Sequence, residues 1–449
     1  MKSYGLLVAA FVLCVLSGLL YWSNHRKPAD DTVKASPDTP PKILSLSEPD
    51  VTALTIKKKG LPEVDLSKKD GAWQITAPKA LRADQEAVSS VLSTLSFLNS
   101  ERLVEDKATD LGSFGLASPA IELDILAKDK TQKLLIGDTT PTGADYAALA
   151  GDPRVFTISS YSKTSLDKSA ADLRDKRVLT ADLDKVSQIE LSAAKKQPVT
   201  LARAKDEWQI LKPAPYRADS SQVDDLVRNL KDAKFDIPSD ADEKKNASLF
   251  ASGSPVATAK VTGSSGTQTI EVRKNKDDYY AKSTAVEGVY KVANTLGTTL
   301  DKSVDDFRNK KLFSFGFSDP GKIEIHDGDK AYFFTHTTSG WWGPDGKQLD
   351  SATVSPLLDK LRSLAATKFP TSGFGKPEIN LTVISNDGKT TDRVLIAKSG
   401  DSYIAKREGE PALYQLDYPA VAAIQEAAVN VKTAPPPAPP AAQKSPAKK

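Results

Sequence analysis

The first domain-sized stretch of the chain opens with short runs in which apolar and polar residues alternate. These runs are Leu54-x-Ile56, Val64-x-Leu66 and Trp73-x-Ile75. Strict alternation is typical of a β-strand with one buried face. Gly60 and Asp70-Gly71 supply turn residues between the runs, so we expect neighbouring strands to pair antiparallel.

A helix is predicted directly after these strands. Asp84 is a favourable N-cap residue. The apolar residues that follow it have the i, i+3, i+4, i+7 spacing of one helix face. They are Val88, Val91, Leu92 and Leu95. The same stripe follows Asp219, where Gln222 stands at the N3 position of a predicted capping box, and it follows Asp350 as well.

Strands and helix recur, which indicates that the chain contains three copies of one unit. Trp73-Gln74-Ile75 returns 135 residues later as Trp208-Gln209-Ile210, and Asp84 returns as Asp219 at the same spacing. The third copy is more diverged, and matching by sequence places Trp342 opposite Trp208. Later landmarks also recur: Tyr146, Tyr280 and Tyr403, and the strands that begin at Val155, Val289 and Leu413. Each copy is the size of a small domain and can bury its own core.

The rest of each unit completes an α+β domain. In the first copy, further strands are predicted within residues 121–158, and a second helix is predicted from Lys163 to Asp175. Strand runs interrupted by single helices favour this class over a parallel βαβ sheet. We therefore expect three tandem homologous domains, each a mainly antiparallel sheet of about six or seven strands with about two helices. Their predicted bounds are 43–182, 183–312 and 313–432.

The segment before these domains predicts a membrane anchor. Tyr4 to Trp22 has no charged residue over 19 positions. As a helix it would span roughly 28 Å, close to the thickness of a bilayer core. We therefore assign residues 1–22 to a transmembrane anchor and the Pro-rich residues 23–42 to a linker. A cleaved signal peptide is the alternative, but no small-x-small cleavage site follows the run.

Localisation follows from this anchor. We expect a single-pass membrane protein with the bulk of the chain on the extracytoplasmic, periplasmic side, because one N-terminal anchor before a long chain is the simplest export signal. The positive charges do not decide the orientation, since Lys2 lies before the run and Arg26 and Lys27 lie after it. Residues 433–449 are rich in Pro, Ala and Lys, and a disordered tail is predicted there. A weak contact of its lysines with anionic envelope polymers is the alternative to a plain spacer.

Composition adds few constraints. The 61 basic and 58 acidic residues give a net charge of +3, which leaves no basic footprint for nucleic acid. The single cysteine, Cys14, falls within the uncharged run. Its isolation fits an oxidising compartment without disulfides and also fits a reducing one.

Residues that specify the fold of the first unit match a known family. The matching positions are Gly71-Ala72-Trp73, Pro78, Ala83-Asp84, Phe114-Gly115-Leu116, Pro119, Ile136-Gly137-Asp138, Tyr146-Ala147 and Leu173-Arg174-Asp175-Lys176. On these residues the chain resembles the bacterial family called domain of unknown function 4340, well over 43–182, moderately over 183–312 and in outline beyond. The resemblance implies a membrane-anchored envelope protein, of a kind often encoded beside ABC-type export or gliding-motility transporter subunits. It carries over no catalytic residues, because none is established for the family.

Residues able to carry chemistry are few and scattered. His326 and His336 flank a predicted strand and could approach each other across a hairpin, but a zinc site needs three or four converging ligands. Ser160-x-x-Lys163 lacks the partner motifs of a penicillin-binding enzyme. Acidic pairs such as Asp224-Asp225 are interpreted as charged surface. We therefore predict no catalytic, cofactor-binding or metal-binding residues, and no cofactor.

Trp341-Trp342 is the one local irregularity. One of these tryptophans is expected in the core, like Trp73 and Trp208. The other could be exposed and contact a sugar ring or the apolar surface of a partner, with core packing or a turn contact as the alternative. Trp341 and Trp342 are therefore the candidate surface-contact residues.

Two functions remain open from the sequence. The first is a non-enzymatic, membrane-anchored envelope protein whose three domains form a protein-interaction scaffold, as an accessory of an ABC-type export or gliding-type transporter. Exposed sheet edges would be its docking strips. The second is a module that binds or hydrolyses envelope glycan through Trp341 or Trp342 and nearby acids. The recurring residues are structural, which favours the first. The expected partners are the membrane and another envelope or transporter protein, without nucleic acid, and the sequence names no small-molecule ligand.

Overall fold

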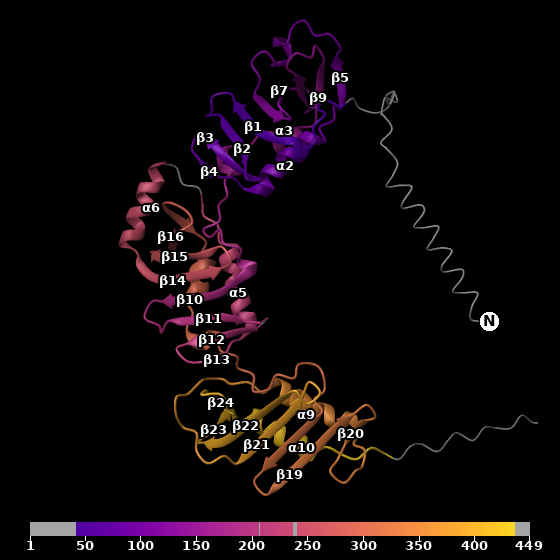
Figure 1. Ribbon diagram of the computed structural model, residues 1–449, viewed down its shortest axis with the longest axis vertical. Coiled ribbons are helices and arrows are strands. Elements are labelled where there is room, and N and C mark those ends of the chain that lie inside the picture. Colours follow the sequence, from indigo (N-terminus) through magenta and orange to yellow (C-terminus); the bar gives the residue numbers. More distant parts are fainter. Residues whose placement is uncertain (1–41, 206, 237–239, 436–449) are drawn as a thin grey trace, which may run out of the picture. The chain divides into compact units, whose positions relative to one another are not determined.

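The computed structural model describes residues 42–205, 207–236 and 240–435 (Figure 1). These residues form two compact units, which divide between Asp175 and Lys176. The first unit contains one nine-stranded sheet, and the second contains an eight-stranded and a seven-stranded sheet. We call the three sheets and their helices the first, second and third repeats. An α+β fold built from antiparallel sheets is thereby confirmed.

The predicted ends of the chain fall largely outside this description. The anchor (1–22), all but the last residue of the linker (23–42), and most of the tail (436–449) are not among the described residues. Within the described ranges, no helix is both long and apolar enough to span a bilayer.

The first repeat has the strand order β4-β3-β2-β1-β6-β7-β8-β9-β5. Its strands are β1 (Val51–Lys58), β2 (Val64–Lys69), β3 (Ala72–Ala77), β4 (Leu81–Arg82), β5 (Arg102–Glu105), β6 (Ile121–Ala127), β7 (Lys130–Thr139), β8 (Asp145–Leu149) and β9 (Val155–Ile158). Its helices are η1 (Glu48–Asp50), α2 (Gln85–Ser96), η2 (Gly112–Phe114), α3 (Ser160–Leu166) and α4 (Ala170–Leu173).

The second repeat has the strand order β13-β12-β11-β10-β14-β15-β16-β17. Its strands are β10 (Val186–Ala193), β11 (Val199–Ala204), β12 (Glu207–Lys212), β13 (Tyr216–Arg217), β14 (Ser254–Gly263), β15 (Gly266–Asn275), β16 (Asp278–Ser283) and β17 (Val289–Val292). Its helices are η3 (Leu183–Lys185), α5 (Ser220–Lys231), α6 (Asp240–Ser252), α7 (Asn294–Leu300) and α8 (Val304–Phe307).

The third repeat has the strand order β20-β19-β18-β21-β22-β23-β24. Its strands are β18 (Lys322–Asp327), β19 (Lys330–Thr337), β20 (Gly340–Trp342), β21 (Ile379–Ser385), β22 (Thr390–Ser399), β23 (Ser402–Arg407) and β24 (Leu413–Asp417). Its helices are α9 (Ser351–Ser363) and α10 (Tyr418–Val429).

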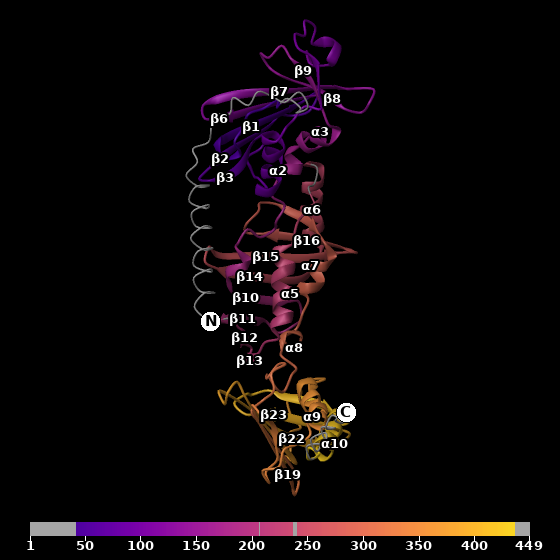
Figure 2. The same ribbon diagram turned by 90° about the vertical axis from the view of Figure 1, so that its right-hand side faces the viewer.

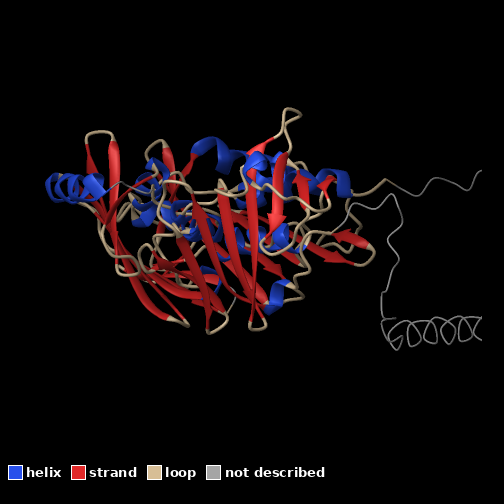
Figure 3. Ribbon diagram, turned by 90° about the horizontal axis from the view of Figure 1, so that it is seen from above, coloured by secondary structure: helices blue, strands red, loops and turns tan. Residues whose placement is uncertain are grey.

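In each repeat, the helix predicted after the first strands covers one face of the sheet. Figures 2 and 3 show helices and strands as separate layers. The predicted stripe of α2 is buried, and its side chains join those of β1, β6 and β7 in one core. All three predicted N-caps are confirmed: Asp84, Asp219 and Asp350 each accept hydrogen bonds from backbone N–H groups of the first turn.

Several predicted details are wrong. The second helix of the first repeat is two short helices, because Ser169 starts a new helix with a capping box to Asp172. Gln222 forms no capping box with Asp219; the Asp219 N–H donates to the carbonyl of Phe307, and the Gln222 side chain accepts from Lys302. Where the first repeat ends in two short helices, the third repeat ends in one continuous helix, α10.

The sequence also underestimated the size of the first two sheets. The two-residue strands β4 and β13 and the strand β5 were not predicted, because they are too short or too irregular to show alternation. Helix α6 was likewise not predicted. Its apolar residues do not form a regular stripe on one face.

Residues near the predicted domain boundaries pack with the repeat that follows them. The first unit ends at Asp175, seven residues before the predicted boundary at 182. Val178 and Leu179 pack in the core of the second repeat, and Leu312 packs in the core of the third. The segment that leaves each repeat is therefore already part of the next.

Short segments pair with both edges of each sheet. After the first helix, the chain forms β5 along β9, and in the other repeats it forms bridges at Phe235 to β17 and at Lys368 to β24. In the first two repeats, the chain after the last helix forms bridges to Ala83 and Ala218, the residues that follow β4 and β13. In the third repeat it forms a bridge to Leu349. The edges are thus less available for strand addition than the sequence suggested.

Candidate functional site at the joint between the second and third repeats

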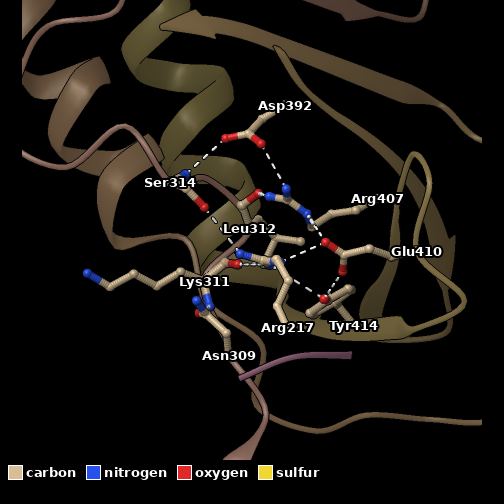
Figure 4. A network of polar contacts seen from close by, with 9 residues as sticks. All are labelled: Arg217, Asn309, Lys311, Leu312, Ser314, Asp392, Arg407, Glu410 and Tyr414. Carbon is tan, nitrogen blue, oxygen red and sulfur yellow. Dashed lines mark hydrogen bonds and ion pairs between the residues drawn. The ribbon is translucent and has the colours of Figure 1, made fainter. Parts of the chain in front are cut away.

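Arg217 lies at the end of the second sheet, where that repeat meets the third. It is the last residue of β13, two residues before the N-cap of α5. Its carbonyl accepts a hydrogen bond from the Asn309 N–H at 2.9 Å, so the segment that leaves the second repeat runs beside it. Figure 4 shows its guanidinium pointing into a group of polar side chains from the third repeat.

The Arg217 guanidinium contacts the third repeat through each of its nitrogens. Nε lies 2.7 Å from Glu410 Oε1 in an ion pair. Nη1 donates to Ser314 Oγ at 3.2 Å, and Nη2 donates to the carbonyl of Lys311 at 2.5 Å. A planar group with five donors is well suited to hold several acceptors at once.

Glu410 is in turn held by groups of its own repeat. Arg407 Nε donates to Glu410 Oε1 at 2.8 Å, and the Tyr414 hydroxyl donates to its other oxygen. Tyr414 is buried, and burial followed by the bond to Glu410 raises the pKa of its phenol. The hydroxyl therefore stays protonated and continues to donate.

A second carboxylate extends the network into the third sheet. Arg407 Nη2 donates to Asp392 at 2.8 Å, and its Nη1 donates to the carbonyl of Leu312. Asp392 also accepts from the Ser314 N–H at 2.9 Å. Both Arg407 and Asp392 are buried, so their charges depend on each other for compensation.

Arg308 reinforces the joint from its other side. It is only 7% exposed, and its guanidinium lies 4.1 Å from the ring centroid of Tyr216 and 3.7 Å from that of Phe369. Tyr216 belongs to the second repeat and Phe369 to the third. Stacking between two rings, together with an ion pair to Asp305 at 3.2 Å, fixes the cation at the boundary.

These side chains mainly bind one another. A hollow of about 610 Å³ borders the network, lined among others by Trp208, Arg217 and Glu410. The ionised groups of the joint that face it are already paired, which favours a structural role for them. Across the residues that the structure describes, no three His, Cys, Asp or Glu side chains gather as a metal site would require.

The family model called domain of unknown function (DUF4340) matches the chain over residues 73–214 and 208–382. The chain belongs to this family. The two overlapping matches start at Trp73 and Trp208, the same landmark of successive repeats, so the family unit occurs more than once here. No curated protein and no solved structure is significantly similar to the chain.

The structure separates the two candidate surface tryptophans. Trp341 is 2% exposed and stands opposite His336 in the sheet, as Trp208 stands opposite Arg203. The core counterpart of Trp208 is therefore Trp341, and the sequence match to Trp342 was wrong by one residue. Trp342 is half-buried, and its Nε1 donates to Thr337 Oγ1 at 3.0 Å. Of the two, Trp342 keeps an accessible ring.

The two histidines do not approach each other. His326 pairs with Ala331 across the β18–β19 hairpin, whereas His336 pairs with Trp341 on the other side of β19. His326 packs edge-on against Phe333, and His336 lies 4.8 Å from the Trp341 ring. Each ring therefore packs against an aromatic residue of a neighbouring strand, and the two rings pack on different partners.

The remaining candidate groups have structural partners. Ser160 and Lys163 lie on the short helix α3, and Ser160 is its first residue. The Lys163 ammonium forms an ion pair with the buried Asp145 at 2.7 Å. Asp224 accepts from Trp208 Nε1 at 3.1 Å, and Asp225 pairs with Arg228. The joint itself was missed from the sequence, because nothing near Arg217 indicates a partner 193 residues later.

Proposed function

We propose that this protein is a non-enzymatic, membrane-anchored envelope protein whose repeated domains form a scaffold for another envelope protein, a subunit of an ABC-type export or gliding-type transporter. The observation that carries the proposal is the joint around Arg217. A scaffold has to present its surfaces in fixed geometry, and an ion-paired joint provides this better than a flexible linker.

The use of the recurring residues supports the same proposal. Asp84, Asp219 and Asp350 cap helices, and Trp73, Trp208 and Trp341 are buried in the three cores. The positions that the repeats share thus serve the fold. A repeated catalytic or ligand-binding unit would be expected to repeat polar side chains in a cleft as well.

Residues 4–22 would anchor the scaffold in the membrane. This proposal is supported by the absence of charged residues in this segment, whose length as a helix would match the thickness of a bilayer core. The domains would then lie on the extracytoplasmic side, within reach of the exposed parts of a transporter. Because the sheet edges are partly paired, the docking surfaces would be loops and open sheet faces.

Capture from native membranes tests the proposal. The full-length chain with a C-terminal affinity tag is cross-linked in membranes, solubilised and analysed by mass spectrometry. We expect a transporter subunit to be enriched, and we expect Arg217→Ala to weaken the enrichment because the joint is loosened. Arg228→Ala, which breaks only the exposed pair with Asp225, serves as the matched control.

Two results would contradict the scaffold. One is capture without any transporter subunit. The other is release of sugar fragments from envelope glycan by the purified protein, abolished by a single Asp or Glu substitution that leaves the fold intact. The second result would establish the glycan-hydrolysing alternative.

A further inference from the structure

The faces of the sheets opposite α2, α5 and α9, which we call the open faces, are covered differently in the three repeats. In the first repeat, the loop before β6 lies on the open face. Its Leu116 packs with Ala148 and Val155 in a small core of their own, and Phe114 contacts Tyr146 edge-on at 5.0 Å.

In the second repeat, α6 covers the corresponding strands. It contacts β15, β16 and β17, and Phe250 lies 4.8 Å from the guanidinium of Arg273. In the third repeat, the same region is a hollow of about 470 Å³. The loop before β21 contributes Phe374 to its lining.

The strand registers show which residues of the third repeat occupy the positions of the covered open face of the first repeat. Glu122, Leu135 and Ala148 form one row across β6, β7 and β8. The matching row across β21, β22 and β23 is Asn380, Leu395 and Lys406. The middle leucine is kept, an acid has become a neutral amide, and an alanine of the small core has become a lysine.

The neighbouring row of residues also loses an acidic side chain between the first and the third repeat. In the first repeat it contains Asp124 and Lys133, and in the third it contains Thr382 and Arg393. Glu122 and Asp124 are the acids that pair with Lys57 and Lys133 in the first repeat. The third repeat thus has Arg393 in place of Lys133 and His326 in place of Lys57, and it lacks both acids.

This exchange leaves polar groups of the hollow without partners. The Lys406 side chain is exposed, and its ammonium has no ion pair or hydrogen bond to any described residue. Asn380 Oδ1 is buried and has no partner in the described part of the chain. Among the described residues, the Arg393 guanidinium pairs only with the exposed Glu408, at 3.4 Å. The remaining acid, Glu324, is neutralised by Lys322 at 2.5 Å.

We propose that the hollow on the open face of the third repeat binds an acidic sugar. The carboxylate of the sugar pairs with Lys406 and Arg393, its hydroxyls bond to Asn380 and Thr382, and an apolar ring face packs on Phe374 and Leu395. The volume lies in the range of small-molecule sites. A cation, neutral hydrogen-bonding groups and an aromatic ring together suit a hydroxyl-rich anion better than an apolar or cationic ligand.

The proposal does not rest on the scaffold function, since the hollow is formed by one repeat alone. It also differs from a glycan contact at Trp342, which is not among the residues that line this hollow. A free acidic sugar and the terminal residue of an acidic glycan share the same chemistry.

Titration calorimetry of the purified full-length protein with sodium glucuronate tests the site. Glucuronate is expected to bind, and glucose, which lacks the carboxylate, is expected to bind at least tenfold more weakly. Lys406→Ala, which installs the first-repeat residue, should weaken glucuronate binding about tenfold, because a bond to a charged group is lost. Lys282→Ala is the matched control, since Lys282 occupies the same row position in the second repeat.

A second variant tests the charge argument independently. Asn380→Glu with Thr382→Asp restores the two acids of the first repeat and should abolish glucuronate binding by repulsion. A glucuronate-containing tetrasaccharide that binds more tightly than the monomer indicates a glycan chain, and equal affinity indicates a single sugar. The proposal is overturned if glucuronate does not bind, if glucose binds equally well, or if Lys406→Ala binds glucuronate like the unmodified protein.

Discussion

Arg217 and Glu410 form an ion pair with 2.7 Å between Nε and Oε1, although one belongs to the second repeat and the other to the third. Glu410 also binds Arg407, which in turn binds Asp392. The second and third repeats thus meet through a chain of paired charged groups. In the first repeat, Arg82 occupies the position of Arg217, since its carbonyl accepts from Asp175 as that of Arg217 accepts from Asn309.

Arg217→Ala should destabilise the second unit by about 2 kcal/mol, the usual cost of losing a hydrogen-bonded partner of a charged group. The variant leaves Glu410 with Arg407 and Tyr414 only. The free energy of unfolding is measured in chemical denaturant, with the exchange of amide hydrogens in β22 and β23 as the readout. Arg228→Ala, at a pair with both side chains well exposed, should change stability by less than about 0.5 kcal/mol. Equal effects of the two variants would contradict a stabilising joint.

The adjacent tryptophans should behave oppositely. Trp341→Ala empties a buried aromatic site and should cost about 3–5 kcal/mol, as should Trp73→Ala in the first repeat. Trp342→Ala removes a half-buried ring with one hydrogen bond to Thr337 and should cost about 1 kcal/mol. Thermal unfolding of the single variants decides this. A larger cost at Trp342 than at Trp341 would show that the core residue is misassigned.

Acid should weaken the first repeat through Glu122. Lys133, at 2.7 Å, and Lys57, at 3.3 Å, hold the pKa of Glu122 below its ordinary value of 4.5, with the bond to Lys133 as the main favourable cause. Because the pKa is lowered in the folded state, this stabilisation is present above pH 4.5 and is lost as pH falls through the lowered value.

Glu122→Gln should therefore destabilise the first repeat at pH 7 and make less difference at pH 3. The free energy of local opening, from amide exchange in β6 and β7, is compared between variant and unmodified protein at each pH. Glu86→Gln, at an exposed helix position, is the control. A difference between Glu122→Gln and the unmodified protein that stays constant from pH 7 to 3 would contradict the pairing.

The anchor gives a separate prediction. A reporter that functions only outside the cytoplasm should be active when fused after Lys449, if Tyr4 to Trp22 spans the membrane. Replacing Leu13 and Leu16 by Arg should release the protein from membranes, since a charge at the centre of a span is costly. A mature N-terminus found after Trp22 would contradict the anchor and support the cleaved signal peptide.

Local patterns in the sequence predicted most of the fold. Alternation gave the strands, and the spacing of Val88, Val91 and Leu92 gave the first helix, because both periods reflect burial of one face. The break at Ser169 was missed because its capping box lies inside an otherwise helical stretch. Trp342 was matched instead of Trp341 because the third repeat is shortened between tryptophan and N-cap.

The joint and the hollow could not be predicted in the same way. Arg217 and Glu410 are brought together by the packing of two repeats, and no local period signals their contact. The hollow is visible only when strand registers align Asn380 with Glu122 and Lys406 with Ala148. Such comparisons need the three-dimensional pairing of strands, not only the repeat in the sequence.

We infer that the joint holds the second and third repeats as one rigid body. Pulsed electron paramagnetic resonance tests it, with spin labels at Thr295→Cys on α7 and Lys360→Cys on α9 in a Cys14→Ser background. We predict one narrow distance distribution that broadens in Arg217→Ala and stays narrow in Arg228→Ala. A broad distribution in the otherwise unmodified protein, or no change in Arg217→Ala, would contradict the claim.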